Sequence, residues 1–281
     1  MNLATLESAG LSLLAATAWG GGDFSGGLAT KHASVFRVVA VAHCAGFVAM
    51  LAMALLTHEP IPPATTMIWG AFAGFIGAFG IAALYRALAV GRMGVVAPVA
   101  AVVTGVLPVL LGTYYDGIPD RIQLVGFALA LASIWLVAGP NENGHSRSGI
   151  GLAALAGVMF GLFLIAGKQA GPHGIFWPLV AARLVSTSLM VAIVLFLPRD
   201  PHPLRRALWA MLLSGLLDSA GNALFIAATR HGRLDVAAVL SSLYPASTVI
   251  LARILLKERI AKLQGVGIAC ALLAVALIST R

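Results

Sequence analysis

The sequence predicts an all-α integral membrane protein whose ten transmembrane helices form two inverted repeats of five helices each. Three observations carry this prediction. The 281 residues are 60% hydrophobic and only 10% charged, whereas a soluble domain carries about 25% charged residues. The apolar residues gather in segments of roughly 20 residues, the length of a helix that crosses a bilayer. The second half of the chain also repeats the first.

The charge balance bears on the partners of the protein. The chain holds 18 Lys and Arg residues against 10 Asp and Glu residues, a formal net charge of +8. The basic residues lie mostly at the ends of apolar segments, where they suit anionic lipid head groups. They form no nucleic-acid-binding stripe, so we expect a lipid bilayer and no nucleic acid as partners. Cys44 and Cys270 lie inside apolar segments and are expected to pack as small hydrophobic residues without a disulfide.

The first half contains five apolar segments, each ended by turn-forming residues. The first segment starts after Glu7 with no Lys or Arg before it, which differs from a secretory signal peptide, so we expect it to be retained. Connector 58–60 ends the second segment, and connector 116–120 ends the fourth. The predicted helices of this half span residues 9–29, 34–56, 66–88, 94–114 and 121–139.

The second half follows the most polar connector of the chain and has the same organisation. Connector 199–203 contains two prolines and ends its second segment. The predicted helices of this half span residues 149–169, 175–197, 205–229, 234–256 and 261–279.

The internal repeat fixes how the halves correspond. Residues 74–138 align with residues 215–279 at a constant offset of 141 and without a gap. An odd number of helices per repeat makes the second repeat enter the membrane from the opposite side, so the repeats should be inverted around a shared site. We assign residues 1–140 to the first repeat, 149–281 to the second and 141–148 to a linker. The identical aligned residues include Gly74 and Gly215, Gly80 and Gly221, Gly91 and Gly232, Arg92 and Arg233, Gln123 and Gln264, and Gly126 and Gly267.

Four prolines lie inside predicted helices, namely Pro98, Pro108, Pro178 and Pro245. Each removes a backbone hydrogen bond and can kink or break its helix. Tyr244 precedes Pro245, so its hydroxyl is expected beside a bend, where it could contact a substrate. The bend could act as a hinge or be a static kink.

Ionisable side chains inside the predicted helices are the candidates for a functional site. They are Asp23, His43, Arg183, Asp218 and, nearer a helix end, Arg86. A charge at the centre of a bilayer costs about 2.5–3.5 kcal/mol on insertion scales, so such residues normally face a cavity or a partner.

Two pairs at helical spacing predict a polar face. Asp218 and Asn222 lie one turn apart and could receive a substrate amine or carry a proton. Trp19 and Asp23 have the same spacing and join an aromatic platform to a carboxylate, which suits a cation or an aromatic amine. These residues form the centre of the predicted substrate site.

Arg183 and His43 occupy near-corresponding places in the two halves, at an offset of 140. Arg183 could bind a substrate carboxylate through two parallel hydrogen bonds, or it could neutralise Asp218 in a structural pair. His43 titrates near physiological pH and could couple protons, or it could be a hydrogen-bonded packing residue.

Several motifs resemble the EamA-type transporters of the drug/metabolite transporter superfamily. Residues 243–245 (Leu-Tyr-Pro), 255–259 (Leu-Leu-Lys-Glu-Arg) and 264–267 (Gln-Gly-Val-Gly) resemble the closing signature of a family repeat. Residues 19–24 resemble the Trp-Gly start of its first helix, and Arg183 matches a frequent Arg in the second helix of a repeat. The first half departs from the pattern with Asp116 where a Glu is expected and His43 where the Arg is expected.

The resemblance implies a secondary-active transporter that exports small metabolites or drugs across the cytoplasmic membrane by alternating access. It implies a multi-pass protein of the inner membrane with a small-molecule substrate. Protons are a candidate coupling ion, and we expect a monomer or homodimer without a cofactor. A lipid-linked sugar flippase and a subunit of a membrane complex are alternatives. A membrane enzyme would need Asp116 and Asp120 to bind a magnesium–pyrophosphate, but the corresponding second loop reads Lys257-Glu258-Arg259. We therefore expect neither catalytic residues nor metal ligands.

The two indicators of orientation disagree. The connectors on the side of the membrane opposite the termini carry more Lys and Arg than those on the side of the termini. This bias favours a cytoplasmic location for the Lys- and Arg-rich side and places both termini outside. The family resemblance implies cytoplasmic termini.

Overall fold

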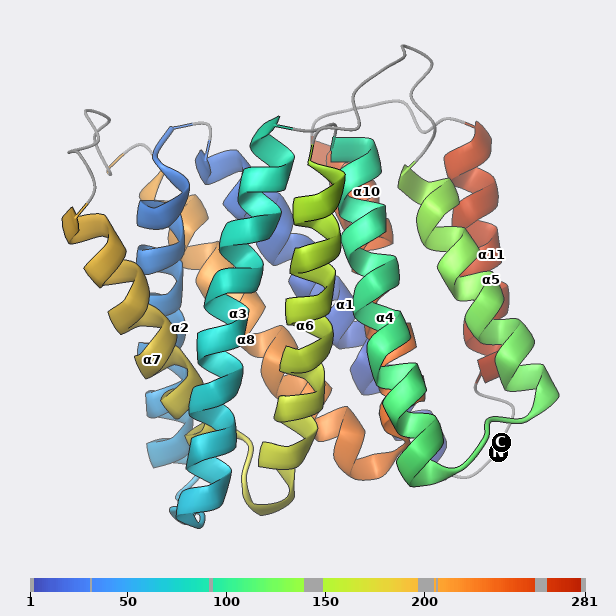
Figure 1. Ribbon diagram of the computed structural model, residues 1–281, viewed down its shortest axis with the longest axis horizontal. Coiled ribbons are helices and arrows are strands. Elements are labelled where there is room, and N and C mark those ends of the chain that lie inside the picture. The colour runs from blue at the N-terminus through green and yellow to red at the C-terminus, as the bar shows by residue number, and fades with distance from the viewer. Residues whose placement is uncertain are drawn as a thin grey trace.

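A computed structural model describes residues 3–30, 32–90, 93–138, 149–196, 205, 207–255 and 262–278. These residues form helices and short connectors, with no strand among them, and Figure 1 shows the helices side by side in one bundle. The predicted linker 141–148, the repeat positions 91–92 and the motif residues 257–259 lie outside the described residues. In chain order the helices are α1 (Leu3–Thr30), α2 (Val35–Leu56), α3 (Ala64–Val90), α4 (Met93–Asp116), α5 (Arg121–Ala138), α6 (Ile150–Ala170), the short 3-10 helix η1 (Gly171–His173), α7 (Phe176–Phe196), α8 (Leu208–His231), α9 (Leu234–Ser241), α10 (Tyr244–Leu255) and α11 (Lys262–Ile278).

Hydropathy located the helices closely. Helix α1 begins six residues earlier than predicted, at Leu3, and the other single helices match their segments within three residues at each end. Among the described residues, five helical stretches are long and apolar enough to cross a membrane, within α2, α3, α6 with η1, α7 and α8. The number of ten transmembrane helices stays a prediction. Large apolar side chains also point outward, with Phe196 90% and Trp209 84% exposed. Such outward apolar faces suit lipid rather than water.

The ninth predicted segment is two helices, α9 and α10, instead of one. The chain turns at Ser242 and Leu243, directly before Pro245. Pro245 has no N–H to donate into the preceding turn, and the Ser242 hydroxyl donates to the Ala238 carbonyl at 2.7 Å. The interruption expected at this proline is therefore present, but the prediction of a single helix over 234–256 is wrong. Helix α4 continues through Pro98 and Pro108, and Pro178 lies in the first turn of α7, where proline is tolerated.

Helix pairs that join the two halves form the centre of the bundle. Helix α1 packs along α8, and helix α3 packs along α6. Gly221 on α8 lies against the Trp19 indole, and Gly80 on α3 lies against the Phe160 ring. A Cβ at Gly221 would come 2.5 Å from Trp19, and one at Gly80 would come 2.8 Å from Phe160. At the offset of 141, each contact is the counterpart of the other with the halves exchanged.

A second pair of close contacts is also repeated, with the glycines at the offset of 141 and the facing alanines at the offset of 140. Gly215 on α8 lies against the backbone of Ala42 on α2, and Gly74 on α3 lies against the backbone of Ala182 on α7. A Cβ at either glycine would overlap the facing backbone. Small residues at helix crossings let backbones approach closely in lipid. The glycines that the repeat preserves therefore fix how α8 crosses α2 and how α3 crosses α7.

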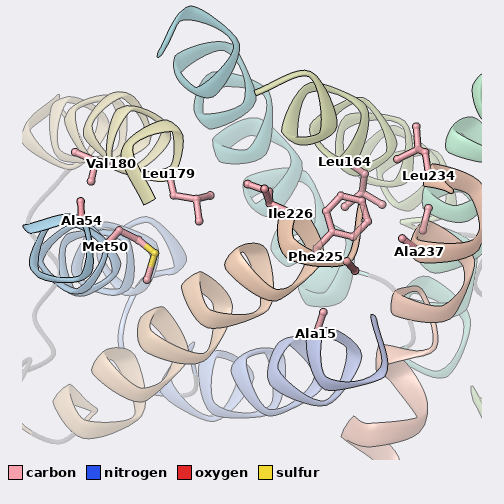
Figure 2. Packing of buried hydrophobic residues seen from close by; sticks show 12 residues of the cluster. Ala15, Met50, Ala54, Leu164, Leu179, Val180, Phe225, Ile226, Leu234 and Ala237 are labelled. Atoms are coloured by element: carbon pink, nitrogen blue, oxygen red, sulfur yellow. The ribbon is translucent and has the colours of Figure 1, made fainter. Parts of the chain in front are cut away.

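One apolar cluster is shared by both halves (Figure 2). Met50 on α2 belongs to the same buried cluster as Leu164, Leu179, Phe225 and Leu234 on α6, α7, α8 and α9. The cluster also includes Ala15 of α1. The halves therefore pack into each other and do not have separate cores. The division at 141–148 stays a prediction.

Glu59 fastens the connector between α2 and α3 to the start of α7. Its carboxylate accepts hydrogen bonds from the backbone N–H groups of Ile175, Phe176 and Trp177 at 2.6, 2.9 and 2.9 Å. The Trp177 indole also donates to the Glu59 carbonyl oxygen at 2.8 Å. A carboxylate at a helix N-terminus satisfies donors that the helix leaves open. These contacts hold the N-terminal start of α7, the helix that carries Arg183.

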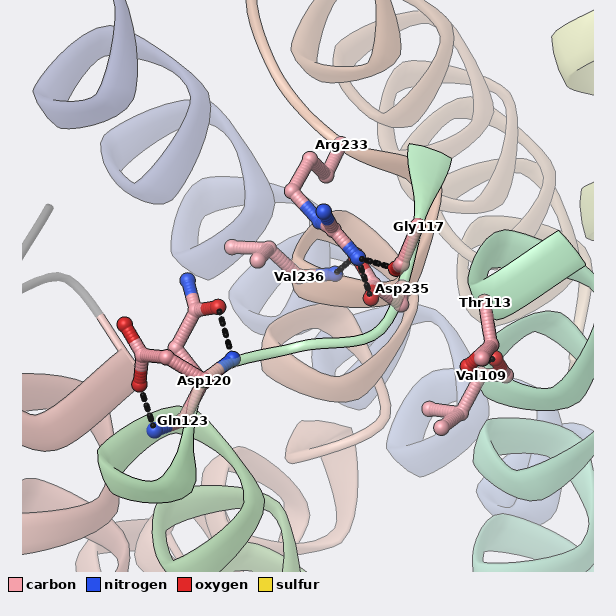
Figure 3. Close-up of polar contacts among 8 residues, drawn as sticks. All are labelled: Val109, Thr113, Gly117, Asp120, Gln123, Arg233, Asp235 and Val236. Carbon is pink, nitrogen blue, oxygen red and sulfur yellow. Dashed lines mark hydrogen bonds and ion pairs between the residues drawn. The ribbon is translucent and has the colours of Figure 1, made fainter. Parts of the chain in front are cut away.

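Arg233 makes a similar link between the two halves (Figure 3). Its guanidinium donates to both carboxylate oxygens of the fully buried Asp235, at 3.0 and 2.8 Å, and to the Gly117 carbonyl at 2.7 Å. Asp120 in the same connector accepts a 2.8 Å hydrogen bond from the Gln123 N–H at the start of α5. The start of α9 is thereby tied to the connector between α4 and α5.

Candidate functional site

A central cavity lies among helices of both halves, next to the break between α9 and α10. It encloses about 760 Å³ of space between protein atoms, including its opening. Every side chain predicted for the substrate site lines it. They are Trp19, Asp23, His43, Arg183, Asp218, Asn222 and Tyr244. The structure therefore brings all of them together, while their roles stay predictions.

Arg183 and Asp218 form an ion pair across α7 and α8, in which an Arg183 terminal nitrogen donates to Asp218 Oδ2. The side chains are 7% and 27% exposed, so the guanidinium is the more enclosed partner. This contact is the one that the structural role of Arg183 requires, and its role toward a substrate stays a prediction. An ion pair inside a membrane protein lowers the cost of placing either charge there.

Polar atoms without partners surround the enclosed side of this pair. Arg183 Nε, Ser219 Oγ and His43 Nδ1 are all buried without a hydrogen-bond partner in the described part of the chain. Gly46 on α2 faces two of them, because a Cβ there would lie 3.2 Å from Arg183 Nε and would overlap Ser219 Oγ. The absence of a side chain at Gly46 lets Arg183 and Ser219 approach α2. His43 is 5% exposed, and its predicted choice between coupling and packing stays open.

Asp23 differs from Asp218 in its contacts. It lines the cavity from α1, and among the described residues its carboxylate makes no hydrogen bond or ion pair. One turn earlier, the Trp19 indole N–H donates to Asn222 Oδ1 at 3.0 Å, and the Trp19 ring lies 5.9 Å from the Phe225 ring. Asn222 therefore keeps its amide N–H groups for other partners. Asp23 is therefore the carboxylate of this cavity that no described side chain pairs with.

The opposite wall of the cavity is apolar. It is formed by α3 and α6, and it includes Phe160, Phe163, Leu164, Gly77 and Ile81. At the offset of 141, this wall occupies the same places in the repeat as the polar wall of α1 and α8. The aligned pairs are Trp19 and Phe160, Asp23 and Leu164, Gly77 and Asp218, and Ile81 and Asn222.

Three polar residues at the cavity were missed by the sequence analysis. Thr104, Ser186 and Ser242 line it, from α4, α7 and the break after α9. Hydroxyl residues are common in membrane helices, so they gave no signal against their background. Ser242 could have been found from its nearness to Pro245. Arg86, which the sequence counted among the charges of the predicted helices, is exposed and does not line the cavity.

Metal chemistry finds no support among the described residues. Those residues contain no group of three or more His, Cys, Asp and Glu side chains that could hold a metal ion. Asp120, considered as a ligand of a magnesium–pyrophosphate, caps α5 instead. Cys44 and Cys270 are both free thiols, as predicted.

Comparison with known proteins shows which family of proteins the sequence matches. A model of the EamA-like transporter family matches residues 8–139 and 147–280, which correspond to the two predicted repeats. A crystal structure of another protein resembles the chain with a TM-score of 0.78 at 16% sequence identity, over 96% of this chain and 95% of that chain. At this identity the likeness concerns the fold alone. No curated protein matches the chain.

Proposed function

This chain belongs to the EamA-like transporter family, and we propose that it exports a small molecule across the cytoplasmic membrane by alternating access. The family is one of transporters, so the chain is a multi-pass membrane protein with a small-molecule substrate. The proposal adds the direction, the inner-membrane location, the mechanism and the site, which is the central cavity. One chain encloses this cavity, so a single copy is enough to form the site.

The relation between the halves supports alternating access. Figure 1 shows α1 and α6, the first helices of the two halves, running in opposite directions across the bundle. The glycine contacts of α8 with α1 and α2 recur between α3 and the helices α6 and α7. Inverted halves of this kind can exchange conformations, which opens a shared site first to one side and then to the other. The break between α9 and α10 provides a place where one half can bend.

The single observation that carries the proposed site is the placement of ionisable side chains. Arg183 and Asp218 lie near the middle of the long apolar helices α7 and α8, Asp23 lies in the second half of α1, and all three face one cavity. A charged side chain inside the membrane is energetically costly, so such residues are normally retained only where a function requires them. Export against a gradient also requires a coupling ion, and a carboxylate such as Asp23 can hold either a proton or a cationic substrate. We therefore propose that protons drive export.

A labelling experiment tests alternating access. Ile81 is half-buried and lines the cavity, so Ile81→Cys is introduced after Cys44 and Cys270 are replaced by Ala. In oriented proteoliposomes, a membrane-impermeant thiol reagent should label this cysteine from either side, because both conformations are visited. Phe196→Cys, on the outward apolar surface, is the control for cavity-specific labelling. Labelling of the cavity position from one side only would contradict the mechanism.

A transport assay tests the function itself. The purified protein is reconstituted into liposomes with a proton gradient, and the movement of labelled amines, amino acids, sugars and carboxylates is measured. Movement should require the gradient and should be lost with Asp23→Asn. Glu7→Gln removes a carboxylate from the same helix at an exposed position and should preserve movement. The function is wrong if no compound of any class moves.

A further inference from the structure

The formal charges of the cavity do not cancel. Two carboxylates and one guanidinium line it, and Asp218 is already paired with Arg183. The remaining negative charge belongs to Asp23, whose carboxylate has no hydrogen bond or ion pair within the described residues. A buried carboxylate without a partner is neutralised either by taking up a proton or by binding a positive charge. A ligand with a single positive charge would make the cavity neutral.

Arg183 is poorly placed to bind a ligand carboxylate. Its terminal nitrogen donates to Asp218, its side chain is only 7% exposed, and its Nε atom is enclosed near Gly46. A carboxylate on the ligand would have to share the guanidinium with Asp218, and it would then lie close to that carboxylate and to Asp23. Like charges at such distances repel strongly in a medium of low dielectric constant. The cavity therefore disfavours anions, and it disfavours zwitterions relative to cations.

The two walls also specify the shape of the ligand. Trp19 lies one turn from Asp23, and Tyr244 lines the same cavity, so aromatic faces are near the unpaired carboxylate. Aromatic faces attract cations. Phe160 and Phe163 form the opposite wall, where a flat apolar body can pack. Gly77 lets the Phe163 ring of this wall pack closely against α3, because a Cβ at this position would come 3.1 Å from the ring.

We propose that the ligand of this cavity is an amphipathic monocation, an amine or quaternary ammonium compound with a flat apolar body. Its positive group binds at Asp23 on the α1–α8 wall, and its body packs against the α3–α6 wall. The Arg183–Asp218 pair serves as an internal, already neutral element that does not bind the ligand. This inference rests on the proposed function for the identity of the site, and it adds the charge and the orientation of the substrate.

Three compounds with the same ring separate the charge classes. Binding of phenethylamine, phenylalanine and 3-phenylpropanoate to the wild-type protein in detergent is measured by calorimetry at pH 8, where an ordinary imidazole is neutral. We expect the amine to bind at least about tenfold more tightly than the other two compounds, the ratio that one well-placed charge interaction provides. Equal binding of the zwitterion or the acid would overturn the inference, and so would no binding by any of the three.

Matched variants test the two ends of the ligand. Asp23→Asn should weaken amine binding at least about tenfold, and Glu7→Gln should leave it unchanged.

Gly77→Ala should weaken binding of 2-naphthylethylamine more than that of propylamine, because the added methyl group narrows the apolar wall. Gly10→Ala is its control, since a Cβ there meets nothing within 4 Å. Unchanged amine binding in Asp23→Asn would overturn the inference. The comparison of the three compounds uses the wild-type protein and decides the question even if a variant does not fold.

The transport assay distinguishes failure of this inference from failure of the function. If a zwitterion or anion moves across the liposome membrane while no amine binds or moves, the charge assignment is wrong and the transporter assignment stands. If no compound moves, the function itself is wrong.

Discussion

The α1–α8 wall and the α3–α6 wall of the cavity have the same backbone design and opposite chemistry. In each, a glycine of one helix lies against an aromatic ring of the other, Gly221 against Trp19 and Gly80 against Phe160. Yet one wall carries Asp23 and the other carries Leu164 at the aligned position. The repeat therefore preserves how the helices cross, and it has diverged where the side chains reach the cavity.

This difference separates two requirements that a transporter has to meet. Close crossings of helices are needed in both halves, because each half has to adopt the conformation of the other during alternating access. Polar residues are needed only where the substrate is held, and each buried charge is costly. A cavity with charges on one wall meets both requirements at the lowest cost. It also gives the substrate one preferred orientation.

The largest effect is expected where the polar wall is broken. Arg183→Leu leaves Asp218 without its partner, and we expect the free energy of unfolding to fall by about 3 kcal/mol. The double variant Arg183→Leu with Asp218→Leu should recover most of this loss, because no unpaired charge remains. Thermal unfolding in detergent measures both. The pair is not a structural element if the double variant is as unstable as the single one.

The corresponding position of the first half provides the matched comparison. His43 lies where the repeat places Arg183 in the second half, and its Nδ1 atom has no hydrogen-bond partner among the described residues. His43→Leu should therefore change the free energy of unfolding by less than about 1 kcal/mol. A loss as large as that of Arg183→Leu would mean that the two halves use these positions alike.

An intermediate effect, equal in the two halves, is expected at the crossings that the repeat preserves. Gly215→Ala and Gly74→Ala each push a methyl group into a facing backbone, at Ala42 and Ala182. Each should lower the free energy of unfolding by about 1–3 kcal/mol, the usual cost of overpacking. Gly10→Ala should have little effect, since nothing lies within 4 Å of its Cβ position. A large difference between Gly215→Ala and Gly74→Ala, measured by thermal unfolding, would show that the crossings are not equivalent.

Hydropathy was sufficient for most of the fold and insufficient for one helix. Apolar segments of the required length are separated by turn residues, so the helix ends could be read from composition. The ninth segment is continuously apolar, and its division into α9 and α10 depends on Pro245 together with the hydroxyl of Ser242 bonding to Ala238. The proline indicated a bend, whereas a full break depends on local hydrogen bonds that hydropathy does not record.

The polar wall of the cavity was predictable, and the apolar wall was not. Asp23 and Arg183 were found because a charge inside an apolar helix is rare. Phe160 and Leu164 resemble any lipid-facing residue, so only their contacts reveal that they line the cavity. Extending the offset of 141 to Trp19 and Asp23 would have indicated both residues. The sequence left Arg183 with two roles, since partner choice depends on the distance between α7 and α8.

The smallest expected effect on stability accompanies the change that makes the two walls alike. Asp23→Leu places on α1 the residue that α6 carries at Leu164, and it removes a carboxylate without a partner among the described residues. The free energy of unfolding should stay the same or rise by about 1 kcal/mol, because an uncompensated buried charge is replaced by an apolar group. Amine binding should disappear, as measured by calorimetry. Glu7→Leu, an equal change at an exposed end of α1, should keep binding intact. If Asp23→Leu still binds the amine, the difference between the walls does not determine which ligand the cavity binds. If binding is lost while stability is undiminished, this carboxylate is retained for function alone.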